Sequence, residues 1–175
     1  VHQTTAQLYS FPLDIIGELV QNSVKSIQER QASEKNHKGL IEITIDSKQK
    51  RVKIVDNGRG FSSLDEIGLA NSGWAKRTAE AGFGFGLTSI MLMSDYASIK
   101  STNTKKDHME IVFKDSYSKQ IKKRQKKWTP HSEQLPKGGS VLPTETEVEM
   151  KGRERVFSFL LGGIEAMVGK EGLSR

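Results

Sequence analysis

Cysteine is absent from this chain of 175 residues, and proline occurs only four times. Without cysteine, a disulfide scaffold, a thiol nucleophile and a thiolate metal site are all excluded. No stretch reaches the roughly 18 uncharged apolar residues that a membrane helix requires, so we expect no contact with a membrane. The first residues, Val1-His2-Gln3, contain no basic and then apolar leader of the kind that directs secretion. The sequence therefore predicts a cytoplasmic protein, or a nuclear one if the organism is a eukaryote.

An initiator methionine is also missing, which leads us to expect a piece of a longer protein with further domains downstream. Hydrophobic residues make up 35% of the chain, which is enough for one packed core at this length. Residues 1–10 are polar and are predicted to form an N-terminal arm. Residues 11–175 are predicted to form a single domain.

The net charge of +6 is concentrated in one short segment. Residues 114–127 contain seven Lys and Arg side chains and a single acid, Asp115, so the rest of the chain is neutral on balance. Such a segment is either a solvated loop or helix face, or a binding surface for nucleic acid or an acidic protein. We expect a basic insert over about 114–137 and leave both interpretations open.

Hydrophobic periodicity predicts one α+β domain without internal repeats. Apolar residues at helical spacing begin after Pro12, and alternating or β-branched runs follow them along the chain. The predicted elements are a helix over Leu13–Glu29, strands over Leu40–Ile45, Arg51–Val55, Tyr96–Thr102, Met109–Lys114 and Glu145–Met150, a helix start over Leu87–Met93 and a closing helix over Arg155–Met167. Two segments without a clear period, Ala70–Ala81 and Pro130–Gly139, are predicted to be loops.

Glu18 and Asn22 lie four positions apart on the first predicted helix, which puts both side chains on one face. Gly17, Gln21 and Lys25 extend this face. A carboxylate beside an amide oxygen suits a hard cation such as Mg²⁺, and the carboxylate can also orient or deprotonate water. Such pairs also occur on ordinary helix surfaces, so the meaning of this pair depends on the other motifs.

A second motif, Asp56-Asn57-Gly58-Arg59-Gly60, follows the second predicted strand. An ionised aspartate presents only hydrogen-bond acceptors, which suit an exocyclic amine such as that of adenine. Gly58 and Gly60 allow positive φ angles and a close approach of the backbone to a ligand. A plain connecting turn accounts for the same residues equally well.

A third motif, Gly82-Phe83-Gly84-Phe85-Gly86-Leu87, precedes an apolar helix start. Its glycines expose backbone N–H groups at a helix N-terminus, an arrangement that binds phosphate. It is not a Walker A loop, because no Gly-Lys-Ser/Thr follows. Its spacing does not match the dinucleotide-binding fingerprint either.

With these three motifs in this order, the chain resembles the GHKL (Bergerat-fold) ATPases from about Phe11 to Met150. This family includes the gyrase B subunit, the ninety-kilodalton heat-shock chaperones, sensor histidine kinases, MutL and the MORC proteins. A fourth family motif, Gly-Thr before a strand, is matched in part by Thr146, because Glu145 replaces the glycine. The resemblance implies a two-layer α/β sandwich with a mixed, mostly antiparallel sheet, helices on one face, and ATP and Mg²⁺ bound on the helix side.

The resemblance also implies a role for each matching residue. Glu18 would polarise the attacking water, Asn22 would hold the Mg²⁺ that bridges the phosphates, and Asp56 would accept from the adenine amino group. The other residues implied to bind ATP are Lys25, Gly58, Gly60, Lys76, Gly82, Gly84, Gly86, Leu87 and Thr146. A lid over about 70–86 would order when nucleotide binds. In several such families a lysine from a following domain completes the site, so slow turnover by this segment alone is expected.

Subgroup traits are mixed, and they leave three functions open. Gln21 stands where gyrase-like, MutL and chaperone members usually have Asp, Lys25 matches a lysine of histidine kinases, and Asn71 to Lys76 is closer to MORC and chaperone members. The principal expectation is Mg-dependent ATP binding and slow hydrolysis that drive lid closure, conformational switching or dimerisation. One alternative is a kinase module that transfers the γ-phosphate to His or Ser of a partner. The other is a nucleotide-gated scaffold that binds nucleic acid through residues 114–127.

Overall fold

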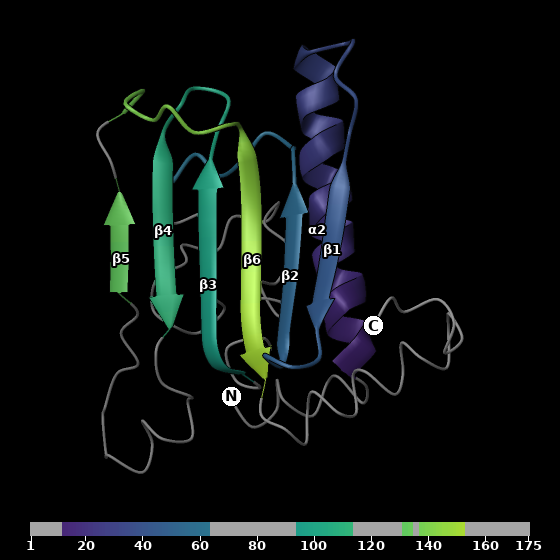
Figure 1. Cartoon of the computed structure of the whole chain (residues 1–175). Helices are drawn as coiled ribbons and strands as arrows, with labels where there is room; N and C mark the ends of the chain where they lie inside the picture. The colour runs from purple at the N-terminus through teal and green to yellow at the C-terminus, as the bar shows by residue number, and fades with distance from the viewer. Residues whose placement is uncertain (1–11, 64–93, 114–130, 135–136, 153–175) are drawn as a thin grey trace, which may run out of the picture.

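The structure is a computed structural model, and it describes residues 12–63, 94–113, 131–134 and 137–152. Within these residues the chain forms a helix followed by six strands (Figure 1). The elements are α2 (Pro12–Ser33), β1 (Ile41–Asp46), β2 (Arg51–Asp56), β3 (Ser94–Thr102), β4 (His108–Phe113), β5 (His131–Gln134) and β6 (Glu145–Gly152). Among these residues, no helix combines the length and apolar character that a bilayer span requires.

The helix α2 begins at Pro12, a residue that suits the first helical position because its missing N–H has no partner there. Leu19, Ser23 and Ile27 follow one another at intervals of four and are all buried. This stripe packs against β1 and β2 at one edge of the sheet (Figure 1). The helix runs four residues beyond the predicted end at Glu29, because polar residues after the apolar stripe continue it.

All six strands form one sheet in the order β1-β2-β6-β3-β4-β5, and every described pairing is antiparallel. The last of the described strands, β6, therefore lies between β2 and β3. Because β2 and β3 end where β6 begins, their terminal residues meet at one end of the sheet (Figure 1). The α/β two-layer sandwich predicted from the resemblance is confirmed.

The core lies on the face of the sheet that α2 covers. Strand residues on this face alternate with outward-facing residues, as the burial pattern of β2 shows most clearly. The buried apolar side chains of the sheet are Val52, Ile54, Ala97, Ile99, Met109, Ile111 and Met150. The register places them in rows, such as Ile54, Ile99 and Ile111, with the partly buried Val148 between Ile54 and Ile99.

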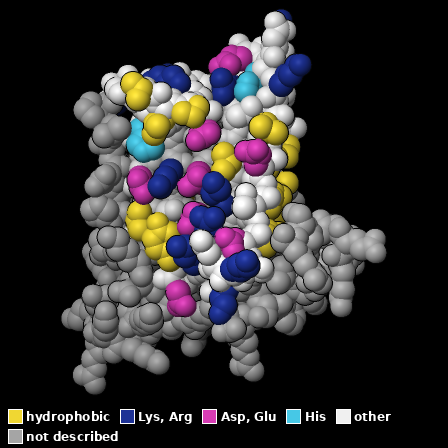
Figure 2. All heavy atoms as spheres, in the orientation of Figure 1, with side chains coloured by type: hydrophobic (Ala, Val, Ile, Leu, Met, Phe, Trp, Pro, Cys, Tyr) yellow, Lys and Arg dark blue, Asp and Glu magenta, His cyan; other side chains and the backbone are white. Residues whose placement is uncertain are grey.

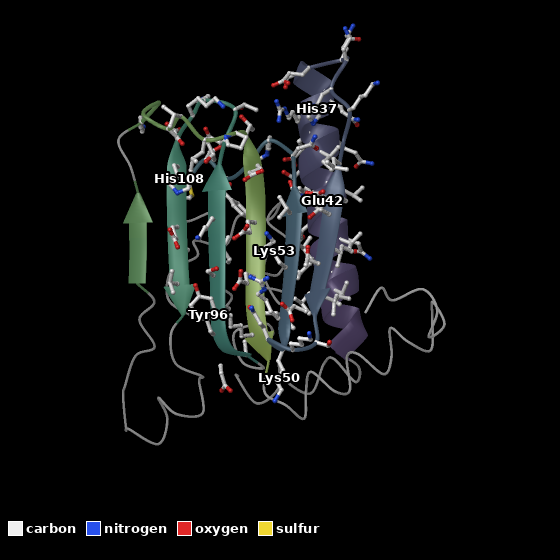
Figure 3. All side chains as sticks on the ribbon, in the orientation of Figure 1. His37, Glu42, Lys50, Lys53, Tyr96 and His108 are labelled. Carbon is white, nitrogen blue, oxygen red and sulfur yellow. The ribbon has the colours of Figure 1, made fainter. Side chains whose placement is uncertain are left out.

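The opposite face of the sheet carries interspersed basic and acidic side chains (Figure 2). Figure 3 shows Glu42, Lys53, Tyr96 and His108 along this face, from four different strands. Ion pairs cross between neighbouring strands here, at 3.7 Å for Arg51–Glu149, 3.5 Å for Lys53–Glu147 and 3.6 Å for Lys100–Glu110. Such partly exposed pairs each contribute about 0.2–1 kcal/mol, so they add modestly to the stability that comes from the apolar core on the α2 side.

One prediction within the described residues was wrong. The segment Pro130–Gly139 was expected to be a loop inside the basic insert, but His131–Gln134 forms the edge strand β5. Its four polar residues have no apolar alternation, so this strand is specified by pairing with β4 and not by its own pattern. The expected arm, the lid, the helix start at Leu87 and the closing helix lie outside the described residues.

Candidate functional site

A buried hydrogen bond joins the helix to the end of β2. Ser23 lies on the side of α2 that faces the sheet, and its hydroxyl donates to Oδ2 of Asp56 at 3.0 Å. The backbone N–H of Gly58 donates to Oδ1 of the same carboxylate at 2.9 Å. Ser23 and Asp56 are each 5% exposed. This carboxylate is therefore held at the boundary between helix and sheet, out of contact with bulk solvent.

Next to this bond, three polar residues form a row across the sheet. Asp56 on β2 is paired with Thr146 on β6, and Thr146 is paired with Ser101 on β3. Oγ of Ser101 and Oγ1 of Thr146 share a hydrogen bond of 3.0 Å. Directly paired residues project from the same face of a sheet, so all three side chains lie on the α2 side. All three are buried, and they form a hydrophilic strip at the margin of an apolar core.

Burial raises the pKa of the Asp56 carboxyl group above its ordinary value of 3.8. The hydrogen bonds from Gly58 and Ser23 oppose this rise because they stabilise the charged form, while the nearby carboxylate of Glu145 adds to it by repulsion. A carboxylate can accept about four hydrogen bonds. Among the described residues, two donors reach Asp56. With respect to these described donors, the carboxylate retains capacity for a further donor, such as an exocyclic amine.

The loop that follows β2 is packed too closely to accommodate side chains at its two glycines. A Cβ atom at Gly58 would overlap the side chain of Ser26 on α2. Gly60 has a φ angle of +73°, and a Cβ atom there would lie 2.7 Å from Cα of Asn103. The loop thus lies in direct contact with the helix on one side and with the turn between β3 and β4 on the other.

The residues predicted to contact phosphates and water lie on α2, the helix that also supplies Ser23 to Asp56. Glu18 is half-buried, whereas Asn22 and Lys25 are exposed. Asn22 directly precedes Ser23, the residue whose hydroxyl reaches Asp56. One helix therefore carries both a candidate ligand for Mg²⁺ and a direct contact to the candidate adenine acceptor.

The donor set at Asn22 suits Mg²⁺ that arrives together with a nucleotide. In the part of the chain that the structure describes, no group of three or more His, Asp or Glu side chains could hold a metal ion by itself. Mg²⁺ commonly takes one or two protein ligands and completes its octahedral shell with phosphate oxygens and water. An exposed amide oxygen one helical turn from a carboxylate fits that mode of binding.

The predicted site residues divide into three sets. Asp56, Gly58, Gly60 and Thr146 are brought together at one end of the sheet. Glu18, Asn22 and Lys25 lie on α2. The remaining predicted ligands, Lys76, Gly82, Gly84, Gly86 and Leu87, lie outside the described residues, as does the segment 114–127.

Sequence reasoning missed Ser23, Ser101 and Asn103. Ser23 is a polar residue within the apolar stripe of α2, and this position was the available signal for a buried role. Ser101, Thr102 and Asn103 form a polar run at the end of β3, and all three residues are buried. A buried polar side chain requires a partner. Ser101 bonds the glycine loop and β6, Thr102 bonds His108 on β4, and Asn103 bonds Phe61 and Asp107.

A family model described as histidine kinase-, DNA gyrase B-, and HSP90-like ATPase matches residues 10–125, well over half of the chain. The chain therefore belongs to this family of ATP-binding ATPases, the GHKL family that the motifs predicted. No curated protein matches the chain. Assignment to the chaperone, MORC or kinase subgroup stays a prediction, because the family description covers gyrase, kinase and chaperone members alike.

Proposed function

We propose that the chain binds ATP with Mg²⁺ on the α2 side of the sheet and hydrolyses it slowly to ADP and phosphate. Asp56 accepts a hydrogen bond from the adenine amino group, supported by the hydroxyl of Thr146. The phosphates run along the exposed face of α2 past Asn22. The observation that carries this proposal is the buried carboxylate of Asp56, which retains acceptor capacity in a polar strip beside an apolar core.

Each residue of α2 has a distinct part in the proposed reaction. Asn22 contributes an amide oxygen to Mg²⁺, which when bound neutralises charge on the phosphates. Glu18 orients the attacking water and accepts its proton as the bond to the γ-phosphorus forms and the bond to the leaving oxygen of ADP breaks. Lys25 and Lys76 offer cationic contacts to phosphate oxygens, and the motif Gly82 to Leu87 offers backbone N–H groups.

Nucleotide calorimetry with Mg²⁺ tests the proposal, comparing ATP, ADP and GTP on the wild-type chain and on Asp56→Asn. We expect adenine nucleotides to bind more tightly than GTP, and the substitution to weaken ATP binding about 100-fold, because an amide nitrogen would face the adenine amino group. Glu42→Gln, an exposed change on β1, is the matched control and should bind as the wild type does. Failure of the folded wild-type chain to bind any adenine nucleotide would contradict the proposal.

Coupling of this cycle to lid closure over about 70–86, and to dimerisation of a larger protein, is the wider role that we propose. ATP-dependent dimerisation is tested by light scattering of the chain with ATP and with ADP. A kinase role is the second candidate, because Lys25 lies three residues after Asn22 as in histidine kinases. Transfer of ³²P from the γ-position of ATP to a protein, and not its release as free phosphate, would favour the kinase.

The segment 114–127 favours an additional role in binding nucleic acid, because its seven basic residues and one acid together equal the net charge of the chain, +6. It connects β4 to β5, the strands at the edge of the sheet farthest from β1. Binding of a DNA duplex that weakens steeply as salt rises would support this role, since phosphate contacts release counterions. Absence of binding at low salt would assign the segment to the solvated surface.

A further inference from the structure

Asn103 begins the turn between β3 and β4, and every polar atom of its side chain is used. Its Nδ2 donates to Oδ2 of Asp107 and to the backbone carbonyl of Phe61, both at 3.1 Å. Its Oδ1 accepts from the backbone N–H groups of Lys105 at 2.9 Å and Asp107 at 3.0 Å. Asn103 is 3% exposed. Because all of the hydrogen bonds of this buried carboxamide are made, the side chain fixes the positions of the groups that it bonds.

This turn is bonded to two other loops at the same end of the sheet. The N–H of Thr104 donates to the carbonyl of Arg59 at 3.1 Å, which attaches the turn to the glycine loop after β2. The N–H of Gly138 donates to Oδ1 of Asp107 at 2.8 Å, which attaches it to the segment before β6. The hydrogen bonds from Asn103 and from the N–H of Gly138 lower the pKa of Asp107 because they stabilise its charged form.

Phe61 is the link between Asn103 and the polar strip. Its carbonyl accepts from Nδ2 of Asn103, and its N–H donates to Oγ of Ser101 at 3.0 Å. Oγ of Ser101 in turn shares a hydrogen bond with Oγ1 of Thr146, the partner of Asp56 across the sheet. The position of the Phe61 backbone therefore determines which way the Ser101 and Thr146 hydroxyl groups can point.

We propose that Asn103 is a positioning residue for adenine selectivity. Its hydrogen bond to the Phe61 carbonyl holds the Gly60–Phe61 backbone, and through Ser101 the hydroxyl of Thr146, in the arrangement that recognises adenine. This inference rests on the proposed ATP site. It assigns to a residue outside all of the predicted motifs an influence on the choice of base, and none on the binding of phosphates, which are expected along α2.

Exchange of two side chains separates this role from a purely structural one. Asn103→Asp alone sets two carboxylates against each other, so we expect it to destabilise the turn. The double variant Asn103→Asp/Asp107→Asn restores a donor and an acceptor between positions 103 and 107. It also keeps the acceptors for Lys105, Gly138 and the N–H of residue 107. It cannot restore the bond to the Phe61 carbonyl, because a carboxylate has no proton to donate.

The readouts are the melting temperature and the affinities for ATP, GTP and inorganic triphosphate with Mg²⁺, measured on the whole 175-residue chain. We expect the double variant to regain most of the melting temperature that Asn103→Asp loses, short of the wild type by the bond to the Phe61 carbonyl that it cannot restore. We also expect it to bind ATP about tenfold more weakly, with an equal loss in the ratio of ATP to GTP affinity and with unchanged affinity for triphosphate. Lys105→Ala, an exposed change on the same turn, should match the wild type in every measurement.

Recovery of both ATP affinity and ATP preference in the double variant would overturn the proposal, and so would equal losses for ATP and triphosphate. If the double variant stays as unstable as Asn103→Asp, the variant Asn103→Ser replaces it, and its ratio of ATP to GTP affinity tests the proposal. A serine hydroxyl can still accept from the turn amides but is too short to reach Phe61. A wild-type chain that binds triphosphate but does not prefer ATP over GTP would refute the selectivity role while leaving the phosphate site intact. A chain that binds neither would refute the ATP site itself.

Discussion

Ser23 and Asp56 meet across the boundary between α2 and the sheet, where the serine hydroxyl donates to the aspartate at 3.0 Å. Ser23 follows Asn22, the candidate ligand for Mg²⁺, and Asp56 is the candidate acceptor for adenine. The proposed adenine contact, Asp56, would therefore be hydrogen-bonded to the chain neighbour of the proposed phosphate-side contact, Asn22. A displacement of α2 along its axis would break this bond and misplace both ends together.

Ser23→Ala tests this connection. Loss of a buried hydrogen bond to a charged group should lower the free energy of unfolding by about 1–3 kcal/mol. It should also weaken ATP binding about tenfold, because the Asp56 carboxylate loses the donor that orients it. Urea unfolding and calorimetry provide the two measurements. Ser33→Ala, at the exposed end of α2, is the control and should change stability by less than about 0.5 kcal/mol. Unchanged ATP affinity in Ser23→Ala would show that the orientation of Asp56 does not depend on the helix.

Asp56 should give the stability of the chain a distinctive dependence on pH. Because burial raises its pKa above 3.8, the folded state binds a proton more tightly than the unfolded state does. Stability from this group is fully present below pH 3.8 and is lost as the pH rises through the raised pKa of the folded state. In urea unfolding at a series of pH values, wild type should lose stability relative to Asp56→Asn across this window and run parallel to it above. A difference that does not vary with pH would contradict the prediction.

We expect glycine to be required at position 60, in the loop after β2, but not at position 17, on the predicted ligand-binding face of α2. Gly60→Ala places a Cβ atom 2.7 Å from Cα of Asn103 at a φ angle of +73°, and we expect a loss of at least about 1–2 kcal/mol. Gly17→Ala in α2 meets no atom within 4 Å and should instead stabilise the chain by about 0.5–1 kcal/mol. Thermal unfolding of the two variants checks the opposite signs. Equal effects would mean that the loop after β2 can move away from the β3–β4 turn.

Glu18→Gln should separate hydrolysis from binding. A glutamine keeps the shape of the side chain but cannot accept a proton from water, so the rate of ATP cleavage should fall about 10²–10⁴-fold. The dissociation constant for ATP should change by less than about threefold. Single-turnover assays with excess protein are needed, because we expect slow turnover by this segment even with Glu18 present. Brisk hydrolysis by the wild-type chain alone, or unchanged cleavage in Glu18→Gln, would contradict the proposed mechanism.

Local pattern predicted most of the described elements to within a few residues. The helix, the hairpin of β1 and β2, and the strands β3, β4 and β6 each have their own period or β-branched run. The strand β5 does not, because an edge strand can be formed by its neighbour's hydrogen bonds with little help from its side chains. The order of the strands was equally out of reach, since it depends on contacts between residues such as Asp56 and Thr146 that lie far apart in sequence.

For the proposed site, the sequence located the residues with ligand-binding chemistry of their own better than the residues that hold them in place. Asp56 and the two glycines after it were found because their motif is continuous and carries its own chemistry. Ser101 and Asn103 were not found, because their role arises from close packing between the β3–β4 turn and the loop after β2. Residues that support a site in this way have no periodic pattern in the sequence. Their only sequence signal is a polar residue at a position where the pattern predicts burial.

The central position of β6 in the sheet has a consequence for the order in which the domain can fold during synthesis. In the described sheet, β6 is the strand that joins the β1–β2 pair to the β3–β4 pair, and it follows both of them in the sequence. Pairing of the inner edges of β2 and β3 therefore requires residues 145–152 to have been synthesised. The same late strand brings Thr146 to Asp56, so the sheet cannot be joined without also bringing the two predicted adenine contacts together.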